Sequence, residues 1–136
     1  MNRTPHTNQT VQKAVEALFM HKIENPVLID LHAFRNLTYD YLIICTCQSE
    51  VQMKAVLNHT RKILRRQGVT GTRIEYSPGV KWGILDCGEL IIHTFEKKTR
   101  AFYSLERMWS DSKITELHGE DYVTEREEDR EEDEYL

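Results

Sequence analysis

The sequence of 136 residues contains little cysteine, proline or glycine and no long apolar run. Its apolar stretches span only a handful of residues, which excludes a transmembrane helix. The N-terminus lacks the basic and then apolar pattern of a secretion signal. The cysteines are odd in number, and Cys45 and Cys47 lie in an apolar, strand-like run. We therefore expect reduced core thiols in a cytoplasmic protein.

The charges are unevenly distributed along the chain. The formal net charge of −4 comes from 18 Lys and Arg and 22 Asp and Glu residues. Gly119 to Leu136 holds 10 acidic and 2 basic residues, which leaves 16 basic and 12 acidic residues in 1–118. The sequence thus combines a mildly basic body with an acidic tail.

The body is long enough for one domain and too short for two. A domain of this size needs no disulfide or metal ion to fold. We expect a flexible N-terminus over residues 1–9 and a single domain over 10–118. The tail, 119–136, has little to bury and is expected to be disordered or weakly helical.

Hydrophobic periodicity predicts an α/β or α+β domain with one mixed sheet flanked by helices, in the order α-β-β-α-β-β-β-α. The continuous apolar run in the second strand indicates a central strand that is buried on both faces. The expected elements cover residues 11–22, 27–31, 40–46, 49–68, 72–76, 81–86, 89–95 and a short helical stretch within 97–109.

The helix ends carry capping signals. Thr7 or Thr10 is placed to cap the first helix. Ser49 and Gln52 match a capping box, in which Ser49 accepts a backbone N–H and Gln52 reaches back. Gly68 is placed to end the second helix in a left-handed conformation. The predicted inner stripe of this helix consists of Met53, Val56, Leu57, Ile63 and Leu64.

Cys87-Gly88 predicts a two-residue hairpin turn that would place Trp82 opposite His93. Strand alternation assigns one face to core packing, with Gly83, Leu85, Leu90, Ile92 and Thr94. The other face mixes apolar and charged side chains: Trp82, Ile84, Asp86, Glu89, Ile91, His93 and Phe95. Such a face is either covered by the last helix, with Trp82 and His93 in the core, or binds a partner. Both interpretations remain open.

Three stretches in this order resemble the ribosomal silencing factor family, also called Iojap-like, over about residues 8–113. They are Asp40–Thr46 followed by Ser49, then Trp82-x-x-Leu85-Asp86-x-Gly88-x-x-x-Ile92-His93-x-Phe95, and last Arg100-x-x-Tyr103-x-Leu105-Glu106-x-x-Trp109-Ser110-Asp111. The resemblance implies a fold similar to the nucleotidyltransferase domain without its catalytic residues, and therefore no enzyme activity. It also implies binding to the large ribosomal subunit through ribosomal protein fourteen, which blocks subunit joining and represses translation.

The residues that match the family motifs supply the contact candidates for this ribosomal protein: Trp82, Asp86, His93, Tyr103 and Glu106. The two aromatic residues would provide buried area, and the acidic residues would set orientation and association rate. Asp86 can instead stabilise the turn, and Glu106 can pair with Arg100. Leu105 and Trp109 are expected to pack in the core.

The residues argue against catalysis and against a metal site. A nucleotidyltransferase needs a Gly-Ser turn and an Asp-x-Asp pair to hold two metal ions. The sequence has no Gly-Ser, and Asp30-Leu31-His32 lacks the second carboxylate. The cysteines and His93 are zinc-ligand types, but no Cys-x-x-Cys pair is present. We expect no cofactor, and a degenerate nucleotidyltransferase is kept as an alternative.

A basic stripe on the second predicted helix suggests a peripheral contact with ribosomal RNA. It consists of Lys54, Arg61, Lys62, Arg65 and Arg66. Such a stripe binds phosphates or is simply solvated, so a general RNA-binding module is a further alternative. We also expect that the hairpin can pair with a second copy when the protein is free, and we expect no membrane contact.

Overall fold

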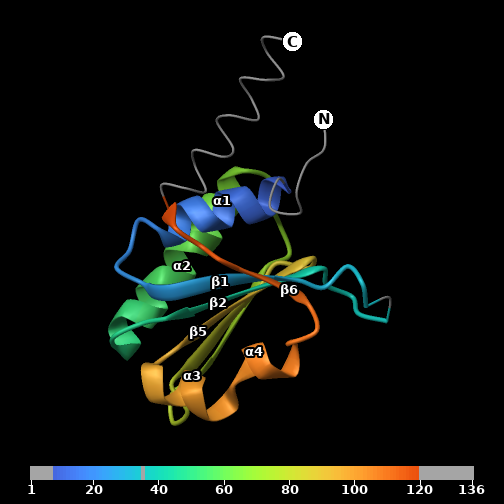
Figure 1. The fold of residues 1–136 in the computed structure, drawn as a ribbon. Helices are drawn as coiled ribbons and strands as arrows, with labels where there is room; N and C mark the ends of the chain where they lie inside the picture. Colours follow the sequence, from blue (N-terminus) through green and yellow to red (C-terminus); the bar gives the residue numbers. More distant parts are fainter. Residues whose placement is uncertain (1–7, 35, 120–136) are drawn as a thin grey trace.

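The computed structural model describes residues 8–34 and 36–119, which form one mixed sheet between two layers of helices (Figure 1). The elements are α1 (Gln9–Leu18), β1 (Glu24–Asp30), β2 (Tyr41–Thr46), α2 (Glu50–Arg66), β3 (Arg73–Ser77), β4 (Trp82–Asp86), β5 (Leu90–Phe95), α3 (Lys97–Tyr103), α4 (Leu105–Met108) and β6 (Lys113–Glu116). No helix in these ranges is long and apolar enough to cross a membrane.

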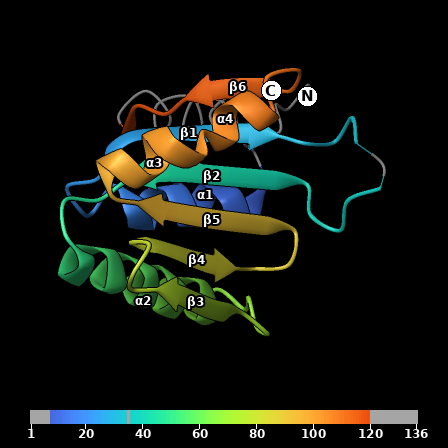
Figure 2. The same ribbon diagram turned by 90° about the horizontal axis from the view of Figure 1, so that it is seen from below.

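The sheet has six strands in the order β3-β4-β5-β2-β1-β6, and only β2 and β5 run parallel. Helices α1 and α2 cover one side of it. Figure 2 shows α3 and α4 on the other side, over the half that contains β2, β1 and β6. Within the described residues, no helix covers β4 and β3 on that side, so the hairpin is only partly enclosed.

The predicted mixed α/β class is confirmed, and two elements were missed. The last strand, β6, adds to the edge of the sheet beside β1, and the last helical stretch is divided into α3 and α4. Ser104 divides it because this residue is left-handed, with φ 47°. A strand as short as β6 carries too few residues to reveal its alternation.

The prediction for the first helix was wrong at both ends. It spans Gln9–Leu18 instead of 11–22 and is capped by Asn8, whose Oδ1 accepts from the backbone N–H of Val11 at 3.1 Å. Thr10 lies inside the helix, and Thr7 lies outside the described residues. The Asn8 side chain satisfies a free N–H at the helix start, which explains the earlier beginning.

The second helix is capped as predicted by Ser49, whose Oγ accepts from the N–H of Gln52 at 3.1 Å. Gln52 reaches back one residue further than predicted, because its Oε1 accepts from the N–H of Gln48. Gly68 follows the helix in a left-handed conformation, with φ 91°. Ile63 is only half-buried, and Thr60 is buried instead; otherwise the predicted inner stripe is confirmed.

Apolar side chains form two cores, one on each side of the sheet. The larger core lies against α1 and α2, and the smaller one lies under α3 and α4. The central strand β2 is buried along its whole length, as predicted, because both sides of the sheet are covered there. Leu105 and Trp109 pack against the smaller core, so their predicted packing role is confirmed.

The predicted register of the β4–β5 hairpin was wrong. Cys87 donates its N–H to the carbonyl of Leu90 at 2.8 Å, so the turn residues are Gly88 and Glu89. Trp82 therefore pairs with Phe95 rather than His93. Gly88 has φ 84°, which suits the first central position of a tight hairpin turn. Because the turn moves by one residue, each β4 residue pairs with a β5 residue two positions further along the chain than predicted. Side chains alternate between the two faces with a period of two, so their predicted assignment to the faces still holds.

Candidate partner-binding surface

The hairpin face is the side of β4 and β5 that carries Trp82, Ile84, Asp86, Ile91, His93 and Phe95. His93 and Phe95 are buried, whereas Trp82 and Ile84 are half-buried. The two open interpretations therefore each describe part of this face. Its end near α3 is enclosed. In the middle of the hairpin, His93 is buried and Ile84 is half-buried, and among the described residues no helix lies over β4 on this side.

Aromatic rings connect the hairpin face to α3. The Trp82 ring lies 4.8 Å from the rings of both Phe95 and Tyr103, measured between centroids. Tyr103 in turn lies 5.1 Å from Phe102. The exposed fraction rises along this series, to 41% for Tyr103 and 80% for Phe102. An anchored series of rings that ends in solvent is suited to burial against a partner protein.

A hydrogen bond holds the Trp82 side chain in place. Its Nε1–H donates to Nδ1 of His93 at 3.0 Å. Burial lowers the pKa of His93 to about 4, so the imidazole is neutral near pH 7 and can accept this bond. His93 thus holds Trp82 from the neighbouring strand, and its own surface is almost fully covered.

Both predicted acidic contact residues have partners within the chain. Asp86 accepts from the backbone N–H of Gly88 at 2.9 Å, as a turn-stabilising carboxylate does. Glu106 accepts from Nη2 and Nε of Arg100 at 2.8 and 3.1 Å. Each carboxylate keeps some exposure, since the Asp86 side chain is 34% and the Glu106 side chain 33% exposed.

The basic residues of α2 lie on the side of the sheet opposite α3 and α4. Lys54 sits over the ring of Tyr76 at 5.0 Å, and Arg61 donates to Thr72 at 3.2 Å. Both therefore lean toward β3. Lys62, Arg65 and Arg66 are exposed. The predicted stripe is present as a solvent-facing set of charges, part of which is engaged with the neighbouring strand.

The cysteines are buried free thiols, and no cluster of three metal-ligating side chains occurs in the described part of the chain. Burial raises the pKa of Cys87 to about 12. The pKa of Cys45 is also raised, by a hydrogen bond with Cys47 and by burial. Asp30 accepts from the backbone N–H of His32 at 3.0 Å, so its carboxylate serves the local turn.

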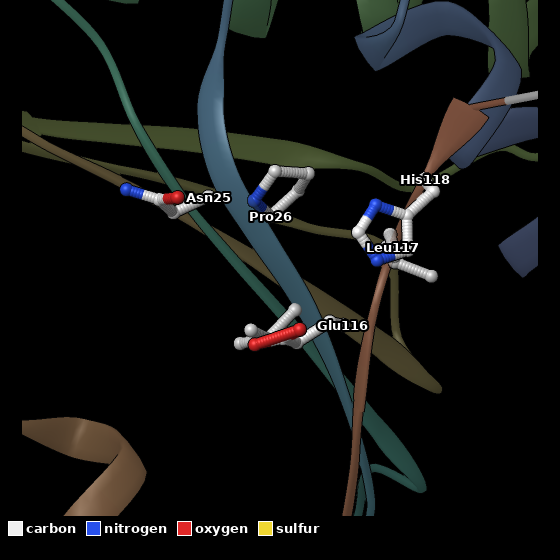
Figure 3. Close-up of a pocket in the computed structure, with 6 residues that line it drawn as sticks. Asn25, Pro26, Glu116, Leu117 and His118 are labelled. Atoms are coloured by element: carbon white, nitrogen blue, oxygen red, sulfur yellow. The ribbon is translucent and has the colours of Figure 1, made fainter.

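Two hollows flank the start of β1. One, of about 200 Å³, is lined by residues of β1 and of the segment that ends β6 (Figure 3), among them Pro26, Glu116 and His118. The other, of about 310 Å³, lies beside α3 and α4 and includes Arg100 and Glu106. Sequence reasoning missed both hollows, because their lining residues come together only in the folded chain. It also missed the exposed Phe102, which is not among the specified residues of the matched motifs.

Comparison with known proteins identifies close relatives. The family described as ribosomal silencing factor during starvation matches residues 4–135. A ribosomal silencing factor of Halalkalibacterium halodurans is 32% identical over 82% of this chain and 94% of its own. One from Bacillus subtilis is 26% identical over 71% of this chain and 80% of its own.

Two solved structures have a fold similar to that of this chain. A crystal structure from Bacillus halodurans has a TM-score of 0.65 at 31% identity and covers 79% of this chain and 96% of its own. One from Chromobacterium violaceum has a TM-score of 0.69 at 24% identity, over 75% of this chain and 84% of its own, and it shows the fold alone.

Proposed function

The chain belongs to the ribosomal silencing factor family, and we propose that it binds the large ribosomal subunit at ribosomal protein fourteen and blocks association with the small subunit. The family consists of non-enzymatic regulators, so the chain acts as a ribosomal silencing factor and not as an enzyme. Steric exclusion requires only affinity and bulk at the joining surface. Translation is repressed because the covered subunits cannot join.

The observation that carries this proposal is the ring series from Trp82 to Phe102, on the side of β4 that faces away from α2. Rings that are fixed on one side and exposed on the other lose little side-chain freedom when a partner covers them. Truncation of such an anchor typically costs about 2 kcal/mol or more of binding energy. Tyr103 is the central contact in this proposal, and its ring packs against Trp82, which His93 holds in position.

Asp86 and Glu106 contribute through their exposed carboxylate edges. Both are already held by internal partners, Gly88 and Arg100. They would therefore meet basic groups of the ribosomal protein in fixed positions. Charges at the edge of an interface mainly affect orientation and association rate, so removing them should slow binding more than it accelerates dissociation.

The basic residues of α2 support a peripheral RNA contact as a second element of the proposal. Because α2 lies on the opposite side of the sheet from α3, the two contacts do not compete for one surface (Figure 2). A phosphate contact of this kind weakens steeply with salt. In the free protein, the same hairpin face could pair with a second copy, and the ribosome would displace that copy. Such a factor would act in the cytoplasm, where subunits join.

The test is sedimentation of the full chain with isolated large subunits. The Phe102→Ala, Tyr103→Ala double variant removes two exposed rings. Its affinity for the large subunit, measured by co-sedimentation, should be at least about tenfold lower than that of the parent chain. The matched control is Met20→Ala, Val51→Ala, which removes two exposed apolar side chains near α1 and α2 and should bind normally. Equal binding of all three proteins would reject the ring series as the contact.

A second measurement tests the mechanism separately from the contact surface. Added to separated subunits, the parent chain should reduce the formation of joined ribosomes and should itself be found only with large subunits. If the protein sediments equally with joined ribosomes, exclusion of the small subunit is wrong, even if the contact residues are correct.

A further inference from the structure

The pocket of about 310 Å³ beside α3 and α4 is strongly cationic. Its lining includes Lys97, Arg100 and Arg107, with Glu106 as its carboxylate. The formal charge of these four side chains is therefore positive by two. A hollow with this charge attracts anions, and its size lies at the lower end of the range of small-ligand pockets, about 300 Å³.

Arg100 is almost buried and has unused donors. Its side chain is 12% exposed. Nε and Nη2 donate to Glu106, and Nη1 donates to Thr46 Oγ1 at 3.0 Å. A guanidinium has five N–H groups, so two have no acceptor within the described residues. Arg100 lines the pocket, so these two N–H groups can donate to an acceptor that enters it.

Two further groups can complete the donor set. The Thr46 hydroxyl is buried, and its oxygen accepts from Arg100, so its own proton remains to be donated. Asn25 also lines the pocket. It lies at an irregularity of β1 where the register shifts, and its backbone is left-handed, with φ 48°. Bulges and strained backbone of this kind occur preferentially beside functional sites.

The remaining cations are free to attract a ligand. Lys97 and Arg107 are exposed and form no ion pair in the described part of the chain. They differ in this from Arg100, whose charge is balanced by Glu106. The pocket therefore combines the nearly buried guanidinium of Arg100, which is held by Glu106 and Thr46, with two exposed positive charges.

The geometry points to this pocket as a binding site for a phosphate group, held without a metal ion. An arginine fork matches the paired oxygens of phosphate, and the surplus of two positive charges matches a dianion. The phosphate can belong to a small molecule, such as a mononucleotide, or to an RNA backbone. None of Trp82, Phe102 and Tyr103 lines the pocket, whereas Glu106, a proposed contact for the ribosomal protein, does.

The test is a titration of the isotopically labelled full chain, followed by nuclear magnetic resonance at constant ionic strength. Inorganic phosphate and adenosine monophosphate should each shift the amide signals of Thr46 and Arg100 in a saturable manner, whereas adenosine should not. Shifts confined to the basic residues of α2, or no saturation, would overturn the proposal.

A pair of charge-matched variants separates a built site from general attraction. Lys97→Ala, Arg107→Ala removes two exposed charges of the pocket and should weaken phosphate binding by about tenfold or more, because hydrogen bonds between charged groups are the stronger ones. Lys22→Ala, Lys113→Ala removes the same charge from exposed positions outside both the pocket and α2 and should leave phosphate binding nearly unchanged. Equal weakening in both variants would contradict a specific site.

A short RNA with a 5′-hydroxyl identifies the source of the phosphate. If this RNA shifts Thr46 and Arg100 at lower concentration than the mononucleotide does, the site binds an RNA backbone. If the mononucleotide binds more tightly, the ligand is a small phosphorylated molecule. Retention of ribosome binding by the Lys97→Ala, Arg107→Ala variant would show that the pocket and the ring series act separately.

Discussion

The indole of Trp82 donates a hydrogen bond to the imidazole of His93 across the β4–β5 hairpin, over 3.0 Å between Nε1 and Nδ1. The two residues are not backbone partners, because Trp82 pairs with Phe95 and His93 with Ile84. The contact is diagonal, as long side chains allow. It requires His93 to be neutral, with its proton on Nε2, since a charged imidazole has no acceptor nitrogen.

His93 should make the stability of the protein dependent on pH. Burial lowers its pKa to about 4 in the folded state, whereas an unfolded histidine titrates near about 6.5. The unfolded chain therefore binds the proton first, and stability is lost as the pH falls from about 6.5 towards 4. Between about pH 7.5 and pH 5, the free energy of unfolding should fall by about 2 kcal/mol from this group. Urea unfolding at several pH values measures it.

The control for this prediction is His93→Asn, whose amide oxygen can still accept from Trp82. This variant should lose most of the pH dependence between these two values. A smaller slope should persist because burial and His59 also lower the pKa of His21. An unchanged slope in His93→Asn would mean that His93 is not the group responsible.

Gly83→Ala should destabilise the fold because α2 approaches β4 closely at this position. An added Cβ would lie 2.6 Å from Leu57 Cδ1 and 2.9 Å from Thr94 Oγ1. Overpacking of this kind typically costs about 1 to 3 kcal/mol. Gly79→Ala is the matched control, since its Cβ would meet nothing within 4 Å. Urea unfolding midpoints compare the two, and equal stability would show that α2 moves aside freely.

The sequence was sufficient to assign side chains to faces, because burial follows the period of each element. The buried strand β2 and the inner residues Met53, Val56 and Leu57 followed directly from this rule. The hairpin register did not, because it depends on whether Gly88 stands first or second in the turn. Both arrangements place the same residues on the same face, so the hydrophobic pattern could not distinguish them.

The phosphate pocket was beyond sequence reasoning for a different reason. Its lining residues come from the start of β1, the end of β2 and the α3–α4 segment, and no local pattern relates these three. The Arg100–Glu106 pair was considered from sequence, but its burial depends on the left-handed Ser104 that turns α4 back. The partner role of Trp82, Asp86, His93, Tyr103 and Glu106 stays a prediction.

Glu106→Ala should destabilise the α3–α4 segment because it leaves the nearly buried Arg100 without its counter-charge. Glu106 accepts two N–H groups of Arg100 at 2.8 and 3.1 Å. Hydrogen bonds to charged groups contribute about 1.5 to 3 kcal/mol each, and partial exposure reduces this, so the expected loss is about 1 to 2 kcal/mol. Chemical unfolding and hydrogen exchange of the α3 amides measure it.

The comparison for this prediction is Glu75→Ala, which removes a carboxylate 3.6 Å from Arg73 in a pair whose side chains are 70% and 61% exposed. Exposed pairs of this kind contribute little, so this variant should unfold almost like the parent chain. A loss in Glu75→Ala as large as that in Glu106→Ala would mean that the burial of Arg100 is not the cause.

Deletion of residues 120–136 should leave binding to the large subunit intact. This acidic segment lies outside the described residues, and the ring series from Trp82 to Phe102 does not include it. The chain before it is anchored, because Leu117 is buried and donates its N–H to the carbonyl of Pro26 at 2.9 Å.

The deletion removes 10 acidic and 2 basic residues, so the formal charge changes from −4 to +4. A positive body should associate with RNA-rich subunits at least as well, most visibly at low salt. Sedimentation with large subunits at two salt concentrations measures this, and loss of binding at both would place an essential contact in the deleted segment.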